Sequence, residues 1–77
     1  MGKTGQNIVG NRVREARKRA HITQEKLSEK LIRLGASIDR AGVAKIEAGI
    51  RGVLDFEIIA LSKALNVGVT WLLGVKE

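Results

Sequence analysis

The side chains that could do chemistry in this 77-residue sequence are mostly cationic. There are fourteen Lys and Arg residues, eight Asp and Glu residues and a single histidine, His21, but no cysteine and no tyrosine. No carboxylate is accompanied by a recognisable acid, base or nucleophile partner, and no cluster of His, Cys and Asp has the spacing of metal ligands. We therefore predict no enzyme, no metal and no cofactor, and we expect His21 to be a solvated residue in a short turn.

The positive charge is concentrated in the first two-thirds of the chain. Residues 1–51 contain twelve Lys and Arg against five Asp and Glu, a net charge of +7, whereas residues 52–77 contain two against three, a net charge of −1. Such one-sided charge is typical of nucleic-acid binding, because cations that neutralise phosphates release condensed counterions. Charge alone leaves open a basic protein that binds nothing specific.

Basic and small residues alternate with apolar ones at helical spacing over residues 40–48. Val43 and Ile46 are placed to face a core, and the residues outside that inner face are Arg40, Ala41, Ala44 and Lys45. Small residues let a helix approach DNA bases closely, and Arg or Lys can pair with O6 and N7 of guanine. The alternative is a helix whose outer face is simply solvated.

Signals for a helix start occur at three places. Thr23, Asp39 and Asp55 are expected N-caps, whose side-chain oxygen accepts a hydrogen bond from a first-turn N–H. Each has an apolar residue directly before it and another four positions after it, the hydrophobic staple that fixes how the chain enters a helix. The three pairs are Ile22 with Leu27, Ile38 with Val43, and Leu54 with Ile59.

Apolar residues at helical spacing predict an all-α fold. Gly35 and Gly49 are expected to end the second and third helices, and Leu27, Leu31 and Leu34 are expected to be buried by the second. The five predicted helices cover about 8–20, 24–34, 40–48, 56–65 and 69–73.

A chain of this length supports one domain. We expect that domain at 8–74, after a disordered arm at 1–7 and before a C-terminal tail at 75–77. No apolar run approaches the roughly 20 residues needed to cross a bilayer, and the first residues lack the apolar stretch of a signal peptide. We therefore expect a cytoplasmic protein.

Five segments, in this order and spacing, resemble the phage-repressor helix-turn-helix family, the Cro-like or Xre-type regulators. They are VREAR at 13–17, ITQEKLS at 22–28, VAKIEAG at 43–49, and ALNV at 64–67 followed by WLLG at 71–74. The resemblance covers roughly residues 9 to 74. It implies a compact, five-helix, lambda-repressor-like domain in which the second and third helices form the helix-turn-helix and the third enters the major groove.

The resemblance also implies roles for individual residues. Gln24 would reach a DNA phosphate and support the third helix, and the positions that face bases or lie beside them are Arg40, Ala41, Gly42, Ala44 and Lys45. Arg17 would form a structural ion pair with Glu47. Arg51 looks like a phosphate contact, with pairing to Asp55 as the alternative.

The chain departs from the family pattern before the third helix. More residues separate Leu31 from Val43 than in most relatives, since Ile32 to Gly42 makes eleven. Gly42 inside a helix costs about 1 kcal/mol relative to Ala and has no side chain with which to read a base. We therefore expect Arg40 and Lys45 to carry most base discrimination.

The predicted function is sequence-specific binding of double-stranded DNA by a bacterial or phage transcriptional regulator, a repressor, acting as a homodimer. The candidate dimer surface is apolar and comprises Phe56, Ile59, Trp71 and Leu73, unless Phe56 and Trp71 merely complete the core. Two other functions stay open: an antitoxin-like or repressor-antagonist module that holds a protein partner, and a nonspecific nucleic-acid binder.

Overall fold

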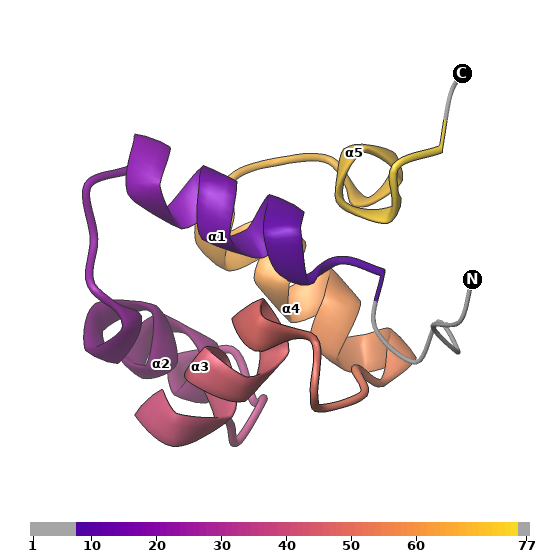
Figure 1. Cartoon of the computed structure of the whole chain (residues 1–77). Helices are drawn as coiled ribbons and strands as arrows, with labels where there is room; N and C mark the ends of the chain where they lie inside the picture. The colour runs from indigo at the N-terminus through magenta and orange to yellow at the C-terminus, as the bar shows by residue number, and fades with distance from the viewer. Residues whose placement is uncertain (1–7, 76–77) are drawn as a thin grey trace.

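The computed structural model describes residues 8–75, which form five α-helices and no strand (Figure 1). The helices are α1 (Gly10–Arg19), α2 (Gln24–Arg33), α3 (Arg40–Ala48), α4 (Asp55–Leu65) and α5 (Val69–Leu73). The predicted all-α class and all five helices are confirmed, although α1 begins at Gly10 rather than Ile8. The predicted arm at 1–7 lies outside the described residues, as do residues 76 and 77 of the predicted tail.

The helices pack so that α3 lies on one side of the molecule. It contacts α2 and α1, while α4 packs behind against the same two helices and α5 rests on α1 and α4 (Figure 1). The result measures 33 × 27 × 22 Å. Among residues 8–75, no helix combines the length and the apolar character that a membrane span requires.

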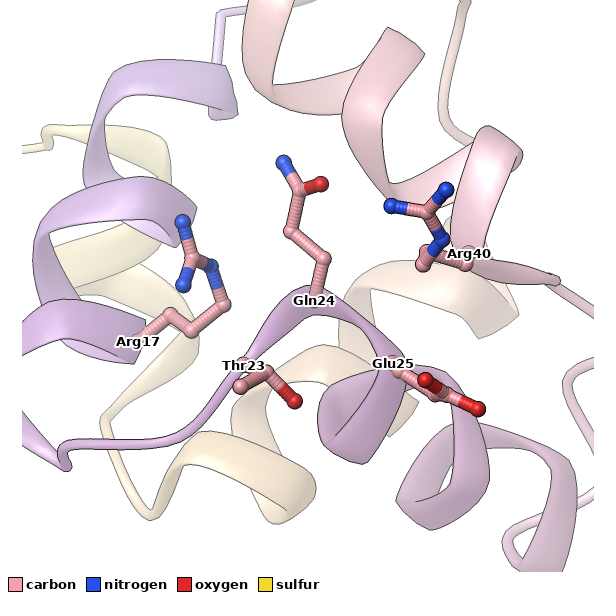
Figure 2. A pocket seen from close by; sticks show the side chains of 5 residues that line it. All are labelled: Arg17, Thr23, Gln24, Glu25 and Arg40. Atoms are coloured by element: carbon pink, nitrogen blue, oxygen red, sulfur yellow. The ribbon is translucent and has the colours of Figure 1, made fainter.

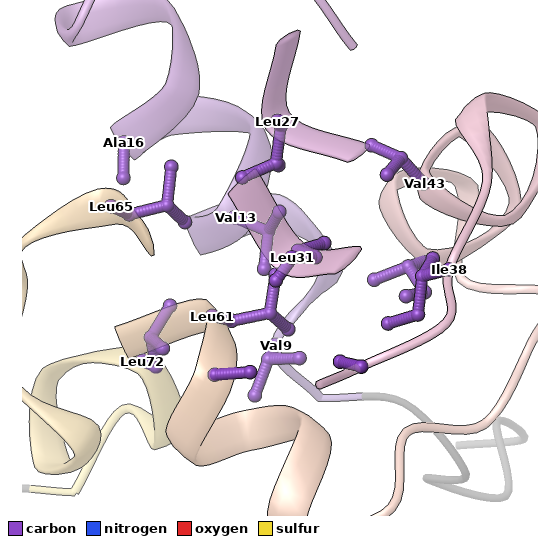
Figure 3. Close-up of a cluster of buried hydrophobic side chains, with 13 residues drawn as sticks. Val9, Val13, Ala16, Leu27, Leu31, Ile38, Val43, Leu61, Leu65 and Leu72 are labelled. Atoms are coloured by element: carbon purple, nitrogen blue, oxygen red, sulfur yellow. The ribbon is translucent and has the colours of Figure 1, made fainter. Parts of the chain in front are cut away.

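Aliphatic side chains from every helix form the core (Figure 3). Its buried members are Val9, Val13, Ala16, Leu27, Leu31, Ala36, Ile38, Val43, Ile46, Ala60, Leu61, Leu65 and Leu72. Burying each larger side chain contributes about 1.5–3 kcal/mol. The core therefore depends on the link between α2 and α3, which supplies Ala36 and Ile38, as well as on the helices.

The prediction that Leu34 is buried is wrong, because its side chain is 45% exposed. It is the C-cap of α2, and the next residue, Gly35, has φ +91°, a left-handed conformation that favours glycine. This turn brings Ala36 and Ile38 back into the core, where both are buried.

Two of the three predicted N-caps are confirmed. The Thr23 hydroxyl accepts a hydrogen bond from the Lys26 N–H at 3.0 Å, and the Asp39 carboxylate accepts one from the Gly42 N–H at 2.7 Å. Gly49, with φ +78°, ends α3 as predicted.

The third predicted cap is wrong by one residue. Leu54 is the N-cap of α4 and Asp55 its first helical residue. The Glu57 carboxylate reaches back and accepts the Leu54 N–H at 2.9 Å, which satisfies a donor at the helix start. Because the helix starts earlier, the staple positions shift to Val53 and Ile58, which are partly buried, and leave the predicted pair of Leu54 and Ile59 exposed.

Candidate nucleic-acid interface

The outer face of α3 is small in the middle and positively charged at its flanks. Val43 and Ile46 are buried, as predicted, which turns Arg40, Ala41 and Lys45 toward solvent. Within residues 8–75, neither Arg40 nor Lys45 makes an ion pair with a carboxylate. A helix face with little bulk and two uncompensated cations can lie close to an anionic surface with acceptors at its floor, which describes the DNA major groove.

A hollow of about 440 Å³ adjoins this face at the start of α2. It is lined by Arg17, Thr23, Gln24, Glu25 and Arg40, and Gln24 rises between the two arginines (Figure 2). First-turn N–H groups make a helix start attractive to anions, and Arg40 adds a full positive charge. The hollow brings together Arg17 of α1, Gln24 of α2 and Arg40 of α3, which are far apart in the sequence.

The back of the hollow is held by one buried carboxylate, that of Glu47 on α3. Arg17 donates to it from Nε at 2.6 Å and from Nη2 at 3.1 Å, so the expected ion pair is present and two-pronged. Arg17 also donates to the Ile22 carbonyl at 2.9 Å. The hydrogen bond to Glu47, together with its charge, raises the pKa of the Arg17 guanidinium against the opposing effect of burial.

Gln24 joins the same carboxylate. Its Nε2 donates to Glu47 at 3.1 Å, which ties the first residue of α2 to the last turn of α3. The amide nitrogen carries two hydrogens, so this bond leaves one donor pointing elsewhere. The expected support of α3 by Gln24 therefore has a physical basis in the bond to Glu47.

Arg51 is paired, but not with the predicted partner. Its guanidinium donates to both carboxylate oxygens of Glu57 at 3.0 Å and to the Gly52 carbonyl at 2.7 Å. The hydrogen bonds to Glu57 raise the pKa of Arg51 and, with the Leu54 N–H, lower that of Glu57. Asp55 instead accepts the Phe56 N–H, and the carboxylate that meets Arg51 is that of Glu57, two residues further on.

Gly42 lies where α3 packs closely against the link that precedes it. A Cβ built on it would lie 2.9 Å from Cγ2 of Ile38 and 3.1 Å from the Asp39 carboxylate, so the residue faces the link before α3. Close packing is therefore a physical reason for glycine here, while its predicted place beside the base-facing residues stays a prediction.

The predicted dimer surface divides into two parts. Trp71 and Leu73 are partly buried against the core, and the Trp71 ring lies under the guanidinium groups of Arg12 and Arg19, at 5.0 and 5.7 Å from its centre. Phe56 and Ile59 are exposed. The exposed large apolar side chains from the end of α3 to the first turns of α4, here named the apolar patch, are Ile50 (71% exposed), Leu54 (58%), Phe56 (53%) and Ile59 (50%).

Residues 8–75 contain no group of three or more His, Cys, Asp and Glu side chains arranged to hold a metal ion. His21, in the turn before α2, is exposed as expected and has φ +59°.

Comparisons with known proteins agree with this geometry. A family model described as helix-turn-helix matches residues 13–72. The restriction-modification controller protein C.AhdI from Aeromonas hydrophila is 31% identical, with a TM-score of 0.73 over 87% of this chain and 90% of that one. The P22 c2 repressor, solved with synthetic operator 9T, is 26% identical, with a TM-score of 0.75 over 91% of this chain and 98% of that one. A search of curated proteins found no match. The chain therefore belongs to the helix-turn-helix family, of the phage-repressor type that its sequence resembles.

Proposed function

We propose that this protein is a transcriptional regulator, acting as a repressor, that binds double-stranded DNA sequence-specifically with α3 in the major groove. The observation that carries the proposal is the outer face of α3, where Arg40 and Lys45 flank small residues and have no carboxylate partner among the described residues. Family membership supports it, as does the similar P22 c2 repressor, which was solved in complex with an operator. Residues 8–74 act as the DNA-binding domain, in the cytoplasm of a bacterial cell.

The hollow at the start of α2 receives a backbone phosphate in this proposal. Gln24 has a second amide hydrogen to donate, and the hollow lies at the first turn of α2, where backbone N–H groups attract anions. Such contacts position the helix and carry no sequence information. Arg51 fits a phosphate contact less well, since Glu57 occupies its guanidinium.

Base discrimination is assigned to Arg40 and Lys45. To test this, duplexes that bind the wild-type protein are selected from a random pool, and affinities for the selected site and for random duplex are compared at one salt concentration. Arg40→Ala is expected to weaken the selected site by about 1–3 kcal/mol, the discrimination of one good base contact, and random duplex much less. Lys63→Ala, which removes the same charge from α4, is the matched control. An equal loss on both duplexes would make Arg40 a phosphate contact.

We further propose that the protein binds as a homodimer through the apolar patch. A single helix-turn-helix contacts few base pairs, and a dimer reads two half-sites about one helical turn apart. Phe56 and Ile59 are three positions apart and share one face of α4, next to exposed Leu54. Trp71 is better explained as part of the packing between α5 and α1.

The same binding measurement separates the competing functions. A ratio of selected-site to random affinity near one would favour nonspecific coating of nucleic acid. No binding even at low salt would favour the antitoxin-like or antagonist module that holds a protein partner.

A further inference from the structure

The link between α2 and α3 is built into the core. Ala36 and Ile38 are fully buried while Ser37 between them is exposed. Backbone bonds hold its course, from the Ala36 N–H to the Leu31 carbonyl at 2.9 Å and from the Ile38 N–H to the Ala36 carbonyl at 2.8 Å. An extended link that could have been loose therefore has a defined path into α3.

A side chain of α2 fastens the end of this link. The Ser28 hydroxyl, on the buried face of α2, donates to the Ile38 carbonyl at 2.7 Å. That carbonyl lies directly before Asp39, the N-cap of α3. The bond is buried, so losing it would leave the Ile38 carbonyl without water to replace the donor.

Gly42 completes the arrangement from the α3 side. The Asp39 carboxylate accepts the Gly42 N–H, and the Ile38 side chain packs over the same turn. With Cγ2 of Ile38 only 2.9 Å from the position of a Cβ, any side chain at 42 would push them apart, since carbon atoms normally approach to about 3.5–4.0 Å.

We propose that Ser28, Ile38 and Gly42 form a latch that sets the position of the first turn of α3, and thereby the sequence selectivity of the protein, without touching DNA. The proposal rests on the proposed function, because it concerns how α3 reads bases. Arg40 and Ala41 directly follow the latched Asp39, so a shift of the link displaces them first. The last turn of α3 is held separately by Glu47, Arg17 and Gln24.

The latch affects specific binding more than nonspecific binding for a geometric reason. A hydrogen bond to a base edge tolerates only a few tenths of an ångström, within about 2.7–3.2 Å, and needs a rigid support. Contacts of long cationic side chains with phosphates tolerate larger shifts and carry most nonspecific affinity. A shift of the first turn should therefore lower the ratio of selected-site to random affinity.

The test uses the full chain with Gly42→Ala and Ser28→Ala, and Ser37→Ala as the matched control from the exposed position of the same link. Affinities for the wild-type selected site and for random duplex are measured well below the unfolding temperature, with helical content checked by circular dichroism. Both latch variants are expected to lose about tenfold or more on the selected site, the scale of one base contact, and less than about twofold on random duplex. Ser37→Ala should change neither affinity.

A double variant tests the geometry directly. Ile38→Leu moves the branch point one carbon further from the backbone and so removes Cγ2, the atom nearest to a Cβ at 42. The loss caused by Gly42→Ala should therefore be smaller in the Ile38→Leu background than in the wild-type background. Equal losses in the two backgrounds would overturn the packing role of Gly42.

Folded latch variants that keep the wild-type ratio, or that lose both affinities by the same factor, would overturn the proposal. Ser28→Ala removes only the hydroxyl that bonds to the Ile38 carbonyl and keeps the apolar contacts of the latch. It therefore tests the proposal even if Gly42→Ala does not fold. A ratio of selected-site to random affinity near one for the wild-type protein would instead overturn the proposed function. That measurement is made before any variant is tested.

Discussion

Two buried glutamates, each held by one arginine, fix the segments around α3. Glu47 pairs with Arg17 and Glu57 with Arg51, and their carboxylates are 4% and 6% exposed. Removing Arg17 would leave the buried Glu47 charge uncompensated and cost about 3–5 kcal/mol. Two of the cations in the basic part of the chain are therefore committed to internal pairs, and the charge offered to DNA comes from others, such as Arg40 and Lys45.

Glu57 makes the stability of the protein pH-dependent. Hydrogen bonds from Arg51, with a further one from the Leu54 N–H, hold the pKa of this carboxyl below its ordinary value of 4.5 against the effect of burial. The unfolded chain then binds a proton at a higher pH than the folded protein does. The stabilisation is complete above 4.5 and is lost as the pH falls through the lower folded pKa.

Glu57→Gln should therefore lower the free energy of unfolding at neutral pH by about 1.5–3 kcal/mol, the range for hydrogen bonds to a charged group. The difference from wild type should shrink as the pH falls below 4.5, which urea unfolding at a series of pH values measures. Glu29→Gln is the control, because its pair with Lys26 is exposed and such pairs contribute about 0–1 kcal/mol. A difference that stays constant with pH would contradict this account of Glu57.

At the scale of elements, α3 is a nine-residue helix with a defined stop at each end. Asp39 caps its start. At its end Gly49 takes the left-handed conformation, and its N–H and that of Ile50 bond back to the Ile46 and Lys45 carbonyls at 3.0 Å. A helix this short is marginal in water by itself, so these ends and the core contacts of Val43 and Ile46 keep it formed.

Gly49→Ala should destabilise the protein by about 1 kcal/mol, because a left-handed residue with a Cβ costs about 1–2 kcal/mol and the stiffer unfolded chain returns about 0.4–1 kcal/mol. Nothing lies within 4 Å of the added Cβ, so the loss comes from the backbone conformation. Gly68→Ala is the control: its φ is −73°. The loss of a preferred N-cap residue, about 0.5–1 kcal/mol, is offset by the stiffer unfolded chain, about 0.4–1 kcal/mol, so the net change should be only a few tenths of a kcal/mol. Chemical denaturation of both variants gives the comparison, and equal losses would refute the conformational explanation.

At the scale of the whole molecule, the DNA-facing surface and the apolar patch are neighbours in sequence. The patch begins at Ile50, two residues after α3 ends, and continues to Ile59 on α4. The ion pair of Arg51 with Glu57 stabilises the segment that joins α3 to α4. A dimer through this patch would therefore hold the two reading helices in a fixed relation, which half-site recognition requires.

The variant Phe56→Ser with Ile59→Ser should be monomeric at concentrations where the wild-type protein sediments as a dimer. It should also lose affinity for the selected two-half-site duplex, because each half-site is then bound alone. Ile32→Ser, which replaces an equally exposed apolar residue on α2, controls for surface polarity. A wild-type protein that is monomeric both free and on DNA would refute the dimer.

The sequence alone determined the features that depend on residues within one helical turn of each other. The helix spacing, the Thr23 and Asp39 caps and the glycine stops at Gly35 and Gly49 are all local, because each joins groups at most a few residues apart. The family followed from the order of such segments, and with it the pair of Arg17 and Glu47, which are thirty residues apart.

Only the tertiary structure decided which distant groups meet. It gave Arg51 the partner Glu57 instead of Asp55, because the helix began one residue earlier than the cap pattern predicted. It left Leu34 exposed where a turn at Gly35 brought Ala36 into the core. It also buried Ile38 in the core, with its carbonyl bonded to Ser28 of α2, because the course of the link depends on where α2 and α3 lie in space.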